Sequence, residues 1–158
     1  MDSLNEKVWW EYLGHDLQEL LMQSNFLLEK AKDISAHDYS FVVFPAAKAY
    51  EGFLKKLFYE LNLITDEDYF GKHFRIGKSL NPNLPKGIRS KEVYGELVKF
   101  TGNSSLADSL WETWRACRNL TFHWFPDEKN AITLPEAEQG IIMIIASIDK
   151  AFRECNIK

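Results

Sequence analysis

Apolar residues recur every three or four positions along four long stretches of this chain, and this periodicity constrains its fold more than any other feature. An α-helix places residues three and four apart on one face, so each stretch predicts an amphipathic helix. The first stretch is rich in leucine, the second and third carry aromatic rings, and the last is rich in isoleucine. The apolar positions are Leu13, Leu17, Leu20, Leu21, Leu27 and Leu28; Ala46, Ala49, Tyr50, Phe53, Leu54, Leu57, Phe58 and Leu61; Leu106, Leu110, Trp111, Trp114 and Cys117; and Ile141, Ile144, Ile145, Ile148 and Phe152.

Capping signals predict where these helices begin. Ser3 followed by Glu6, and Thr133 followed by Glu136, each have the spacing of a capping box, in which two side chains satisfy free amides at a helix start. We therefore expect one long helix from Ser3 to about residue 32 and a last helix from Thr133. A second helix is expected to begin near Pro45, because proline suits a first turn. The isoleucine-rich run would also suit a strand, but its length and its capping box favour a helix.

Residues 64 to 102 interrupt the helical pattern. Residues 65 to 70 predict a short helical turn, residues 81 to 87 a loop rich in proline and asparagine, and residues 90 to 100 another short helix. The third main helix follows the stop signals at 102 to 104 and is expected to end near Phe122, before a turn at 126 to 130. The sequence thus predicts an all-α single domain over residues 1–158, a four-helix bundle with an irregular insert between the second and third main helices.

Composition and charge narrow the classes of function. Hydrophobic residues make up 46% of the 158 positions, enough for a sizeable core, and the net charge of −4 argues against a general nucleic-acid coat protein. The two cysteines, Cys117 and Cys155, form neither a metal set nor a disulfide framework, and His15, His37 and His73 lack metal spacing. We expect no metal and no cofactor. The polar N-terminus and the short apolar runs predict a cytoplasmic protein without a membrane segment.

Arg118, Asn119 and His123 stand together near the end of the third main helix, shortly before Pro126. An arginine holds a phosphate in a planar fork, and a histidine moves protons near neutral pH. On an α-helix Asn119 and His123 share a face, whereas Arg118, five residues before His123, diverges from it. Arg118 and His123 can meet only if the helix ends near Phe122 or if Arg118 reaches round the helix. The geometry also suits a two-fold dimer in which two copies of the motif share one cleft. These residues predict phosphodiester cleavage without a metal.

The stretch from Arg118 to His123 resembles the Arg-x4-His motif by which HEPN domains are recognised. Residues 47 to 55 are similar to the corresponding helix of the toxins of the RNase LS type. The resemblance implies a metal-independent endoribonuclease that acts as a toxin. Such toxins resemble one half of a toxin–antitoxin pair. RNA would be cleaved by 2′-hydroxyl attack, which leaves a 2′,3′-cyclic phosphate. It also implies a homodimer and a cognate antitoxin as partners, with Arg118, Asn119 and His123 as the catalytic residues.

Two further residues are candidates for substrate binding. Some HEPN proteins carry an acidic residue on the second helix near the cleft, so Glu51 is expected to support the site, or else to be an ordinary surface carboxylate. Arg115 lies one turn before Arg118 and would extend a phosphate track, or would pair with Glu112 instead. The aromatic residues around His123 would stack on a splayed RNA base, or pack in the core or a dimer interface; they are Phe122, Trp124 and Phe125.

Other interpretations remain open. Arg118 would pair with a surface carboxylate, and His123 would cap a helix C-terminus, if the motif were purely structural. A non-catalytic HEPN module, which dimerises or binds a nucleotide or partner protein, is the alternative function. Another HEPN branch pairs with a nucleotidyltransferase that modifies a tyrosine two residues after the motif histidine. Phe125 stands at that position, which makes this pairing less favoured.

Overall fold

The computed structural model describes residues 4–156, and all regular secondary structure in that part of the chain is helical. The predicted all-α fold class is therefore confirmed. The α-helices are α1 (Trp10–Leu13), α2 (His15–Ala31), α3 (Ser40–Glu60), α4 (Asp66–Phe70), α5 (Ile76–Ser79), α6 (Lys86–Arg89), α7 (Val93–Thr101), α8 (Ser105–Trp114) and α9 (Leu134–Glu154). The 3-10 helices are η1 (Leu4–Glu6) and η3 (Pro126–Glu128), and η2 (Arg115–Leu120) is a π-helix.

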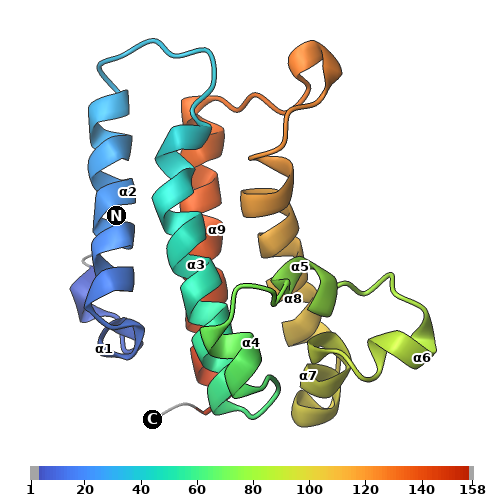
Figure 1. The fold of residues 1–158 in the computed structure, drawn as a ribbon. Helices are drawn as coiled ribbons and strands as arrows, with labels where there is room; N and C mark the ends of the chain where they lie inside the picture. Colours follow the sequence, from blue (N-terminus) through green and yellow to red (C-terminus); the bar gives the residue numbers. More distant parts are fainter. Residues whose placement is uncertain (1–3, 157–158) are drawn as a thin grey trace.

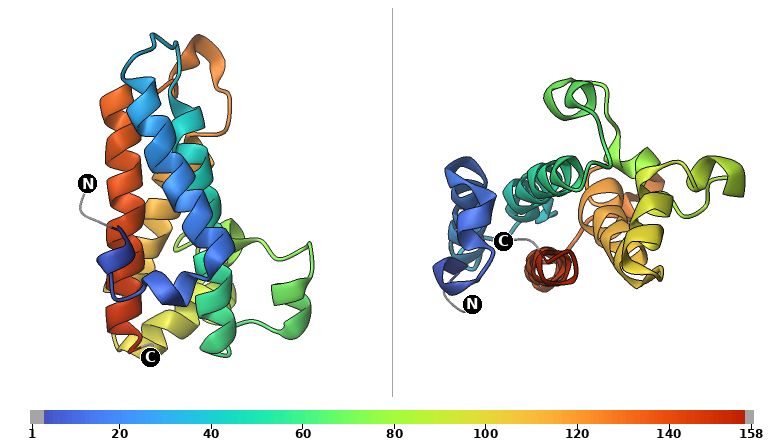
Figure 2. Two further views of the ribbon diagram at one scale, coloured as in Figure 1. Left: turned by 90° about the vertical axis from the view of Figure 1, so that its left-hand side faces the viewer. Right: turned by 90° about the horizontal axis from the view of Figure 1, so that it is seen from below.

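Helices α3 and α9 form the centre of the molecule, with α2 on one side and α8 with η2 on the other (Figure 1). Helix α9 contacts α2 as well as α8, so the long helices share one core. The segment from α4 to α7 lies at the lower end, and Figure 2 shows α4 and α6 projecting away from the long helices. None of the described helices is both long and apolar enough to cross a membrane.

The predicted single helix from Ser3 to about residue 32 is wrong. The described part of this segment is divided into η1, α1 and α2, and Gly14 separates α1 from α2. Gly14 has φ +78° and ψ 159°, a conformation that side-chain-bearing residues rarely adopt and that breaks the helical hydrogen bonds. The proposed cap at Ser3 lies outside the described residues. The leucine residues therefore keep their helical spacing on both sides of Gly14, although the helix itself is interrupted there.

Helix α3 begins at Ser40, five residues before the predicted start near Pro45. The carboxylate of Asp38 accepts hydrogen bonds from the backbone N–H of Ser40 at 3.0 Å and from its hydroxyl at 2.8 Å, which organises the helix start. Pro45 therefore lies beyond the first turn, where its missing N–H gives up one hydrogen bond to the carbonyl of Phe41. The proline is buried, so its packing offsets that loss.

The other predicted elements agree with the structure to within a few residues. The turn at 65 to 70 is α4, with a capping box formed by Thr65 and Asp68. The short helix expected at 90 to 100 is α7, and the loop at 81 to 87 leads into α6. The predicted capping box of the last helix is confirmed, since the Thr133 hydroxyl accepts from the backbone N–H of Glu136 at 3.4 Å and the Glu136 carboxylate accepts from the N–H of Thr133 at 2.7 Å.

A buried hydroxyl connects three of the long helices. Tyr50 of α3 is completely buried, and its hydroxyl lies 3.1 Å from the carbonyl oxygen of Leu110 in α8 and 2.9 Å from Oγ of Ser147 in α9. A buried polar group is costly unless it is hydrogen-bonded, so these contacts define how α8 and α9 sit against α3. Because Glu51 follows Tyr50 directly, the same packing places Glu51 beside the end of the helix that carries the motif.

Candidate active site

The motif begins in a π-helix rather than at the end of a regular α-helix. The chain changes from α-helix to π-helix at Arg115, and η2 ends at Leu120, two residues before the predicted end near Phe122. The hydroxyl of Thr121 donates to the backbone carbonyl of Ala116 at 2.6 Å and so satisfies an acceptor of η2. Short π-helical segments are frequent at functional sites. A π-helix has more residues per turn than an α-helix. The side chain of Arg118 therefore points in a different direction from the one that α-helical geometry predicts.

The side chain of Arg118 lies between an aromatic ring and a carboxylate. Its guanidinium carbon is 5.2 Å from the ring of Trp114, and its Nε is 3.9 Å from Oε2 of Glu51. The second distance is too long for a hydrogen bond, and the two side chains are 40% and 43% exposed, so this ion pair is weak. These side chains border a hollow of about 400 Å³, the Arg118 hollow, which is lined by Phe44, Ala47, Lys48, Glu51, Arg118 and Phe122.

His123 lies beyond the end of η2 and borders a different hollow. This His123 hollow has a volume of about 470 Å³ and is lined by His37, Asp38, Ser40, Phe44, Thr121, Phe122, His123, Trp124, Asn130 and Ala131. Phe44 and Phe122 line both hollows, and their rings meet edge to face with centroids 5.3 Å apart. The structure therefore brings Glu51 to Arg118 but places His123 in the neighbouring hollow, across an aromatic pair.

Asn119 and Arg115, the other predicted catalytic and substrate-binding residues, lie outside both hollows. Asn119 is half-buried and lines neither of them. The guanidinium of Arg115 pairs with the carboxylate of Glu112 at 2.9 Å on the surface, so it points to a partner of its own rather than to Arg118. Among the aromatic candidates Phe122 and Trp124 line the His123 hollow, while Phe125 does not.

The loop that carries His123 is held by Asn130. The side-chain amide of Asn130 donates to the carbonyl oxygens of Leu120, at 3.3 Å, and of His123, while its oxygen accepts from the backbone N–H of Phe125 at 3.2 Å. Asn130, rather than His123, thus satisfies a free carbonyl at the end of η2. Asparagine side chains commonly form hydrogen bonds with nearby backbone groups in turns. The position of Asn130 in the predicted turn after Pro126 was therefore the one feature of the sequence that indicated this role.

Asp38 is the charged group on the other wall of the His123 hollow. Its carboxylate accepts hydrogen bonds from the backbone N–H groups of Ile132, at 3.1 Å, and Ser40, as well as from the Ser40 hydroxyl. Burial acts to raise the pKa of Asp38, but these hydrogen bonds outweigh it and hold the pKa below its usual value. Asp38 is therefore ionised at neutral pH. Its role depends on Ile132, 94 residues away, so the sequence offered no local signal for it.

Cys117 lies next to Arg118 but faces the core. Its thiol is buried and lies 3.5 Å from the carbonyl oxygen of Gly140, and burial raises its pKa to about 12. A thiol that stays protonated at neutral pH is a poor nucleophile, so Cys117 is a packing residue. Within residues 4–156 no group of three or more His, Cys, Asp or Glu side chains is arranged to hold a metal ion.

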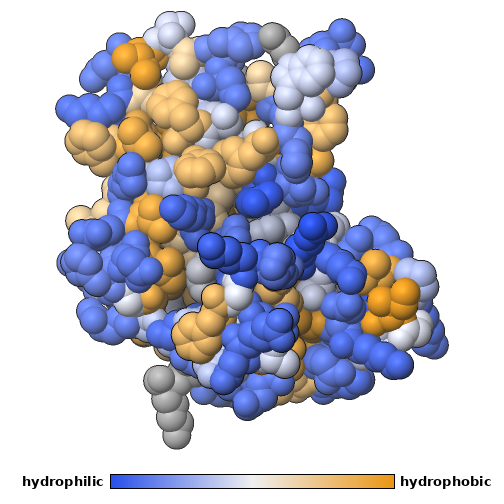
Figure 3. Space-filling model, in the orientation of Figure 1, coloured by the Kyte–Doolittle hydropathy of each residue, from blue (hydrophilic) through white to orange (hydrophobic). Residues whose placement is uncertain are grey.

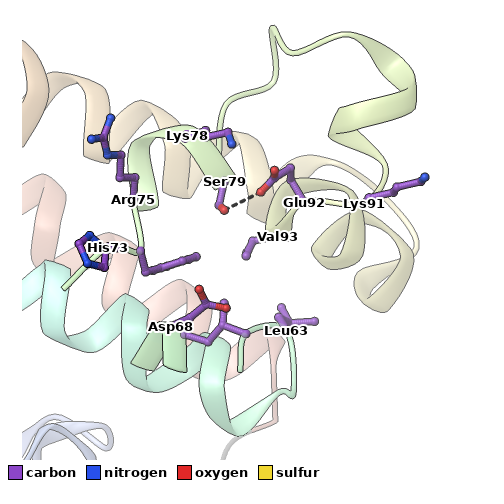
Figure 4. Close-up of a pocket in the computed structure, with 11 residues that line it drawn as sticks. Leu63, Asp68, His73, Arg75, Lys78, Ser79, Lys91, Glu92 and Val93 are labelled. Carbon is purple, nitrogen blue, oxygen red and sulfur yellow. Dashed lines mark hydrogen bonds between the residues drawn. The ribbon is translucent and has the colours of Figure 1, made fainter. Parts of the chain in front are cut away.

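A third hollow, of about 480 Å³, lies in the α4–α7 segment and contains no motif residue. Figure 4 shows that Ser79 and Glu92 face one another across it, with a hydrogen bond of 2.7 Å. Arg75 and Lys91 extend away from one another, so these cations do not converge on a common ligand (Figure 4). This hollow is not part of the candidate site.

The site thus offers a partly exposed cation and an imidazole in adjoining hollows, separated by two aromatic rings. Arg118 is suited to hold an anion, and His123 is suited to transfer a proton to or from a group bound beside it. No family model, no curated protein and no solved structure matches this chain. The chemistry of the site is therefore the basis on which its function is assigned.

Proposed function

We propose that the protein is a metal-independent endoribonuclease of the HEPN superfamily that acts as the toxin of a toxin–antitoxin or defence system. The observation that carries this proposal is the position of Arg118. Its guanidinium borders an open hollow and, among the described residues, contacts the Trp114 ring and makes a loose ion pair with Glu51. A phosphate would form shorter, charge-assisted hydrogen bonds to the guanidinium and would displace Glu51 from it.

The proposed reaction uses the RNA itself as the nucleophile. The 2′-hydroxyl oxygen attacks the adjacent phosphorus, the bond from phosphorus to the 5′-oxygen breaks, and the products carry a 2′,3′-cyclic phosphate and a 5′-hydroxyl. His123 takes the proton from the 2′-hydroxyl or delivers one to the leaving oxygen. Arg118 stabilises the additional negative charge of the transition state, and Asn119 positions His123 or the phosphate. DNA lacks the nucleophile and is not cleaved.

A two-fold dimer would resolve the separation between Arg118 and His123. The two residues border different hollows within one chain, so Arg118 of one copy and His123 of the other could face the same phosphate. Such an arrangement gives each cleft one cation and one imidazole. The dimer is thus part of the proposed active form.

The second candidate function is a non-catalytic HEPN module that dimerises or binds a nucleotide or a partner protein. The ion pair between Arg118 and Glu51, together with the separate hollow of His123, favours it. The net charge of −4 also disfavours strong binding to RNA in general. Cleavage activity separates the two candidates.

The test is cleavage of RNA in the presence of EDTA by the wild-type protein and by Arg118→Ala and His123→Ala. We expect cleavage by the wild type and a loss of about a hundredfold or more in each variant. Arg153→Ala and His15→Ala are the matched controls, because Arg153 and His15 form surface ion pairs with Asp149 and Glu19 away from the site. The controls should cleave normally.

An RNA with a single 2′-deoxy substitution at the cut site tests the nucleophile. Cleavage at that position, dependence on added metal, or full activity of Arg118→Ala and His123→Ala would exclude the mechanism. Both side chains are partly or fully exposed, so the variants should remain folded. A variant that unfolds would show instead that the motif residue has a structural role.

The toxin assignment is tested in cells. Expression of the wild-type protein should arrest growth, expression of His123→Ala should not, and co-expression of the product of the neighbouring gene should relieve the arrest. Growth arrest by His123→Ala equal to that of the wild type would contradict the assignment.

A further inference from the structure

We propose that the His123 hollow is a binding pocket for one base of a single-stranded RNA, with Phe44 as its stacking surface and Asp38 as the acceptor for an amino group of the base. This inference rests on the proposed function, because it names the part of the substrate that the same site receives. It concerns a neighbouring subsite, and its two central residues have no place in the motif.

The aromatic lining of the hollow is unusually exposed. The side chains of Phe44 and Trp124 are 55% and 76% exposed, although large aromatic residues are usually buried. The ring of Phe122 meets Phe44 edge to face and supports it from the protein side. Exposed, supported aromatic rings are the surfaces on which the bases of single-stranded RNA stack.

The polar lining adds an acceptor of defined geometry. Oδ1 of Asp38 accepts from the backbone N–H groups of Ser40 and Ile132, and Oδ2 accepts from the Ser40 hydroxyl. A carboxylate oxygen has two lone pairs, so Oδ2 can accept one more hydrogen bond. Adenine, cytosine and guanine each present an exocyclic amino group to such an acceptor, whereas uracil has a carbonyl oxygen where cytosine has this amino group and offers only its ring N3–H as a donor on that edge. The pocket is therefore expected to disfavour uracil.

The two hollows together have the pattern of a nucleotide. The Arg118 hollow supplies a cation for the phosphate, and the His123 hollow supplies aromatic rings and an acceptor for the base. Phe44 and Phe122 line both, so a bound strand would cross this aromatic pair, with one phosphate beside Arg118 and a base on Phe44. If a second copy of this chain packed on Phe44 and Phe122 instead, it would have to place an acidic group near Arg118 and a hydrogen-bond donor or basic group near Asp38.

The test uses fluorescently labelled five-nucleotide RNAs with 2′-fluoro sugars, which cannot be cleaved by 2′-hydroxyl attack. Oligocytidine and oligouridine form the matched pair, because both are pyrimidines and differ at the amino position. Fluorescence anisotropy should show that the wild type binds oligocytidine about tenfold more tightly. Phe44→Leu should weaken binding about tenfold, Phe44→Trp should preserve it, and Phe70→Leu, an exposed ring on α4, should have no effect.

Asp38→Asn tests the acceptor. Asparagine keeps an oxygen for the backbone N–H groups and replaces Oδ2 by an amide donor, so the preference should shift from cytosine toward uracil. Thermal unfolding shows whether Asp38→Asn has lost stability. If it has, the base pocket is tested by the cytosine preference of the wild type and by the binding of the Phe44 variants. Equal affinity for the two probes together with an unaffected Phe44→Leu variant would overturn the inference, as would the absence of binding.

The outcomes separate this inference from the proposed function. Binding that depends on Phe44 without any cleavage of natural RNA would overturn the ribonuclease and keep the base pocket. Cleavage with binding that does not depend on Phe44 would do the reverse. If Phe44→Leu converted a dimer into a monomer and left RNA binding unchanged, the rings would belong to an interface between copies, and the base pocket would be excluded.

Discussion

Tyr50 and Cys117 show how single buried groups connect the site to the core. Tyr50 joins α3 to α8 and α9 through its hydroxyl, and the thiol of Cys117 packs against Gly140 immediately before Arg118. Burial raises the pKa of the Tyr50 hydroxyl above its ordinary value and raises the pKa of the Cys117 thiol to about 12. The fold therefore accommodates both groups in their neutral, protonated forms.

These shifts predict a loss of stability at alkaline pH. Above about pH 9 the unfolded chain releases the Cys117 proton while the folded chain keeps it, so the unfolded state binds fewer protons and the free energy of unfolding falls as the pH rises. The expected slope is about 1.4 kcal/mol per pH unit for this thiol until the pH approaches 12. Urea unfolding measured from pH 8 to 11 should show the decline.

Cys117→Ala is the matched variant for this prediction. It should reduce the slope between pH 9 and 11, whatever it does to stability at pH 7. An identical slope in the variant would mean that the thiol does not carry the effect.

At the scale of elements, α5 packs closely against Trp114, the last residue of α8, directly before the π-helix η2 that carries Arg118. A Cβ added at Gly77 would lie 2.8 Å from Nε1 of Trp114, the ring on which Arg118 rests. Trp114 is buried, so it has little room to move. The insert thus supports the position of Arg118 through Gly77 and Trp114.

Gly77→Ala should therefore lower the free energy of unfolding by about 1–3 kcal/mol, because the added methyl forces the indole ring to shift. Gly87→Ala is the control, since no atom lies within 4 Å of its added Cβ and alanine favours the helix α6. Urea unfolding of both variants checks the prediction. Equal stability of Gly77→Ala and the wild type would show that this contact is not tight.

The capping box at the start of α9 predicts a second effect on stability. The side chain of Thr133 accepts a hydrogen bond from the backbone N–H of Glu136, and the Glu136 carboxylate accepts one from the N–H of Thr133 at 2.7 Å. Thr133→Ala should cost about 1 kcal/mol in the free energy of unfolding. Thr65→Ala removes the same motif from α4, which buries no side chain, and should cost less. A larger loss in Thr65→Ala would contradict the assignment of α9 to the core.

At the scale of the whole molecule, apolar side chains gather on one face over α2 and α3. Figure 3 shows them in the upper part of this face, with strongly hydrophilic side chains across its middle. Met22 and Phe26, four residues apart on α2, are both exposed. Contiguous exposed apolar surface commonly marks an interface between proteins.

We expect the protein to be a two-fold dimer at micromolar concentration, with Phe26 in or near the interface. Phe26→Asp should shift the equilibrium toward the monomer and leave the helical circular dichroism unchanged, because Phe26 is exposed. Glu29→Asp, a conservative change on the same helix, is the control. Sedimentation that showed a monomeric wild-type protein would count against the dimer and against a shared cleft.

The local pattern of the sequence predicted most of the helices, the capping box at Thr133 and the irregular segment from residue 64 to residue 102. These features depend on residues three or four positions apart, so periodicity and turn chemistry predict them. The sequence also singled out Arg118, Asn119, His123 and Glu51 as candidates. Their chemistry depends on residue type and can be recognised without a fold.

Only the tertiary structure decided how those candidates are arranged. The contact between Arg118 and Glu51 joins residues from α3 and η2, and the wall shared by the two hollows joins Phe44 to Phe122. The early start of α3 depends on Asp38, which also binds Ile132 across the fold. Such contacts form between residues far apart in the chain when helices pack, and local periodicity contains no information about them.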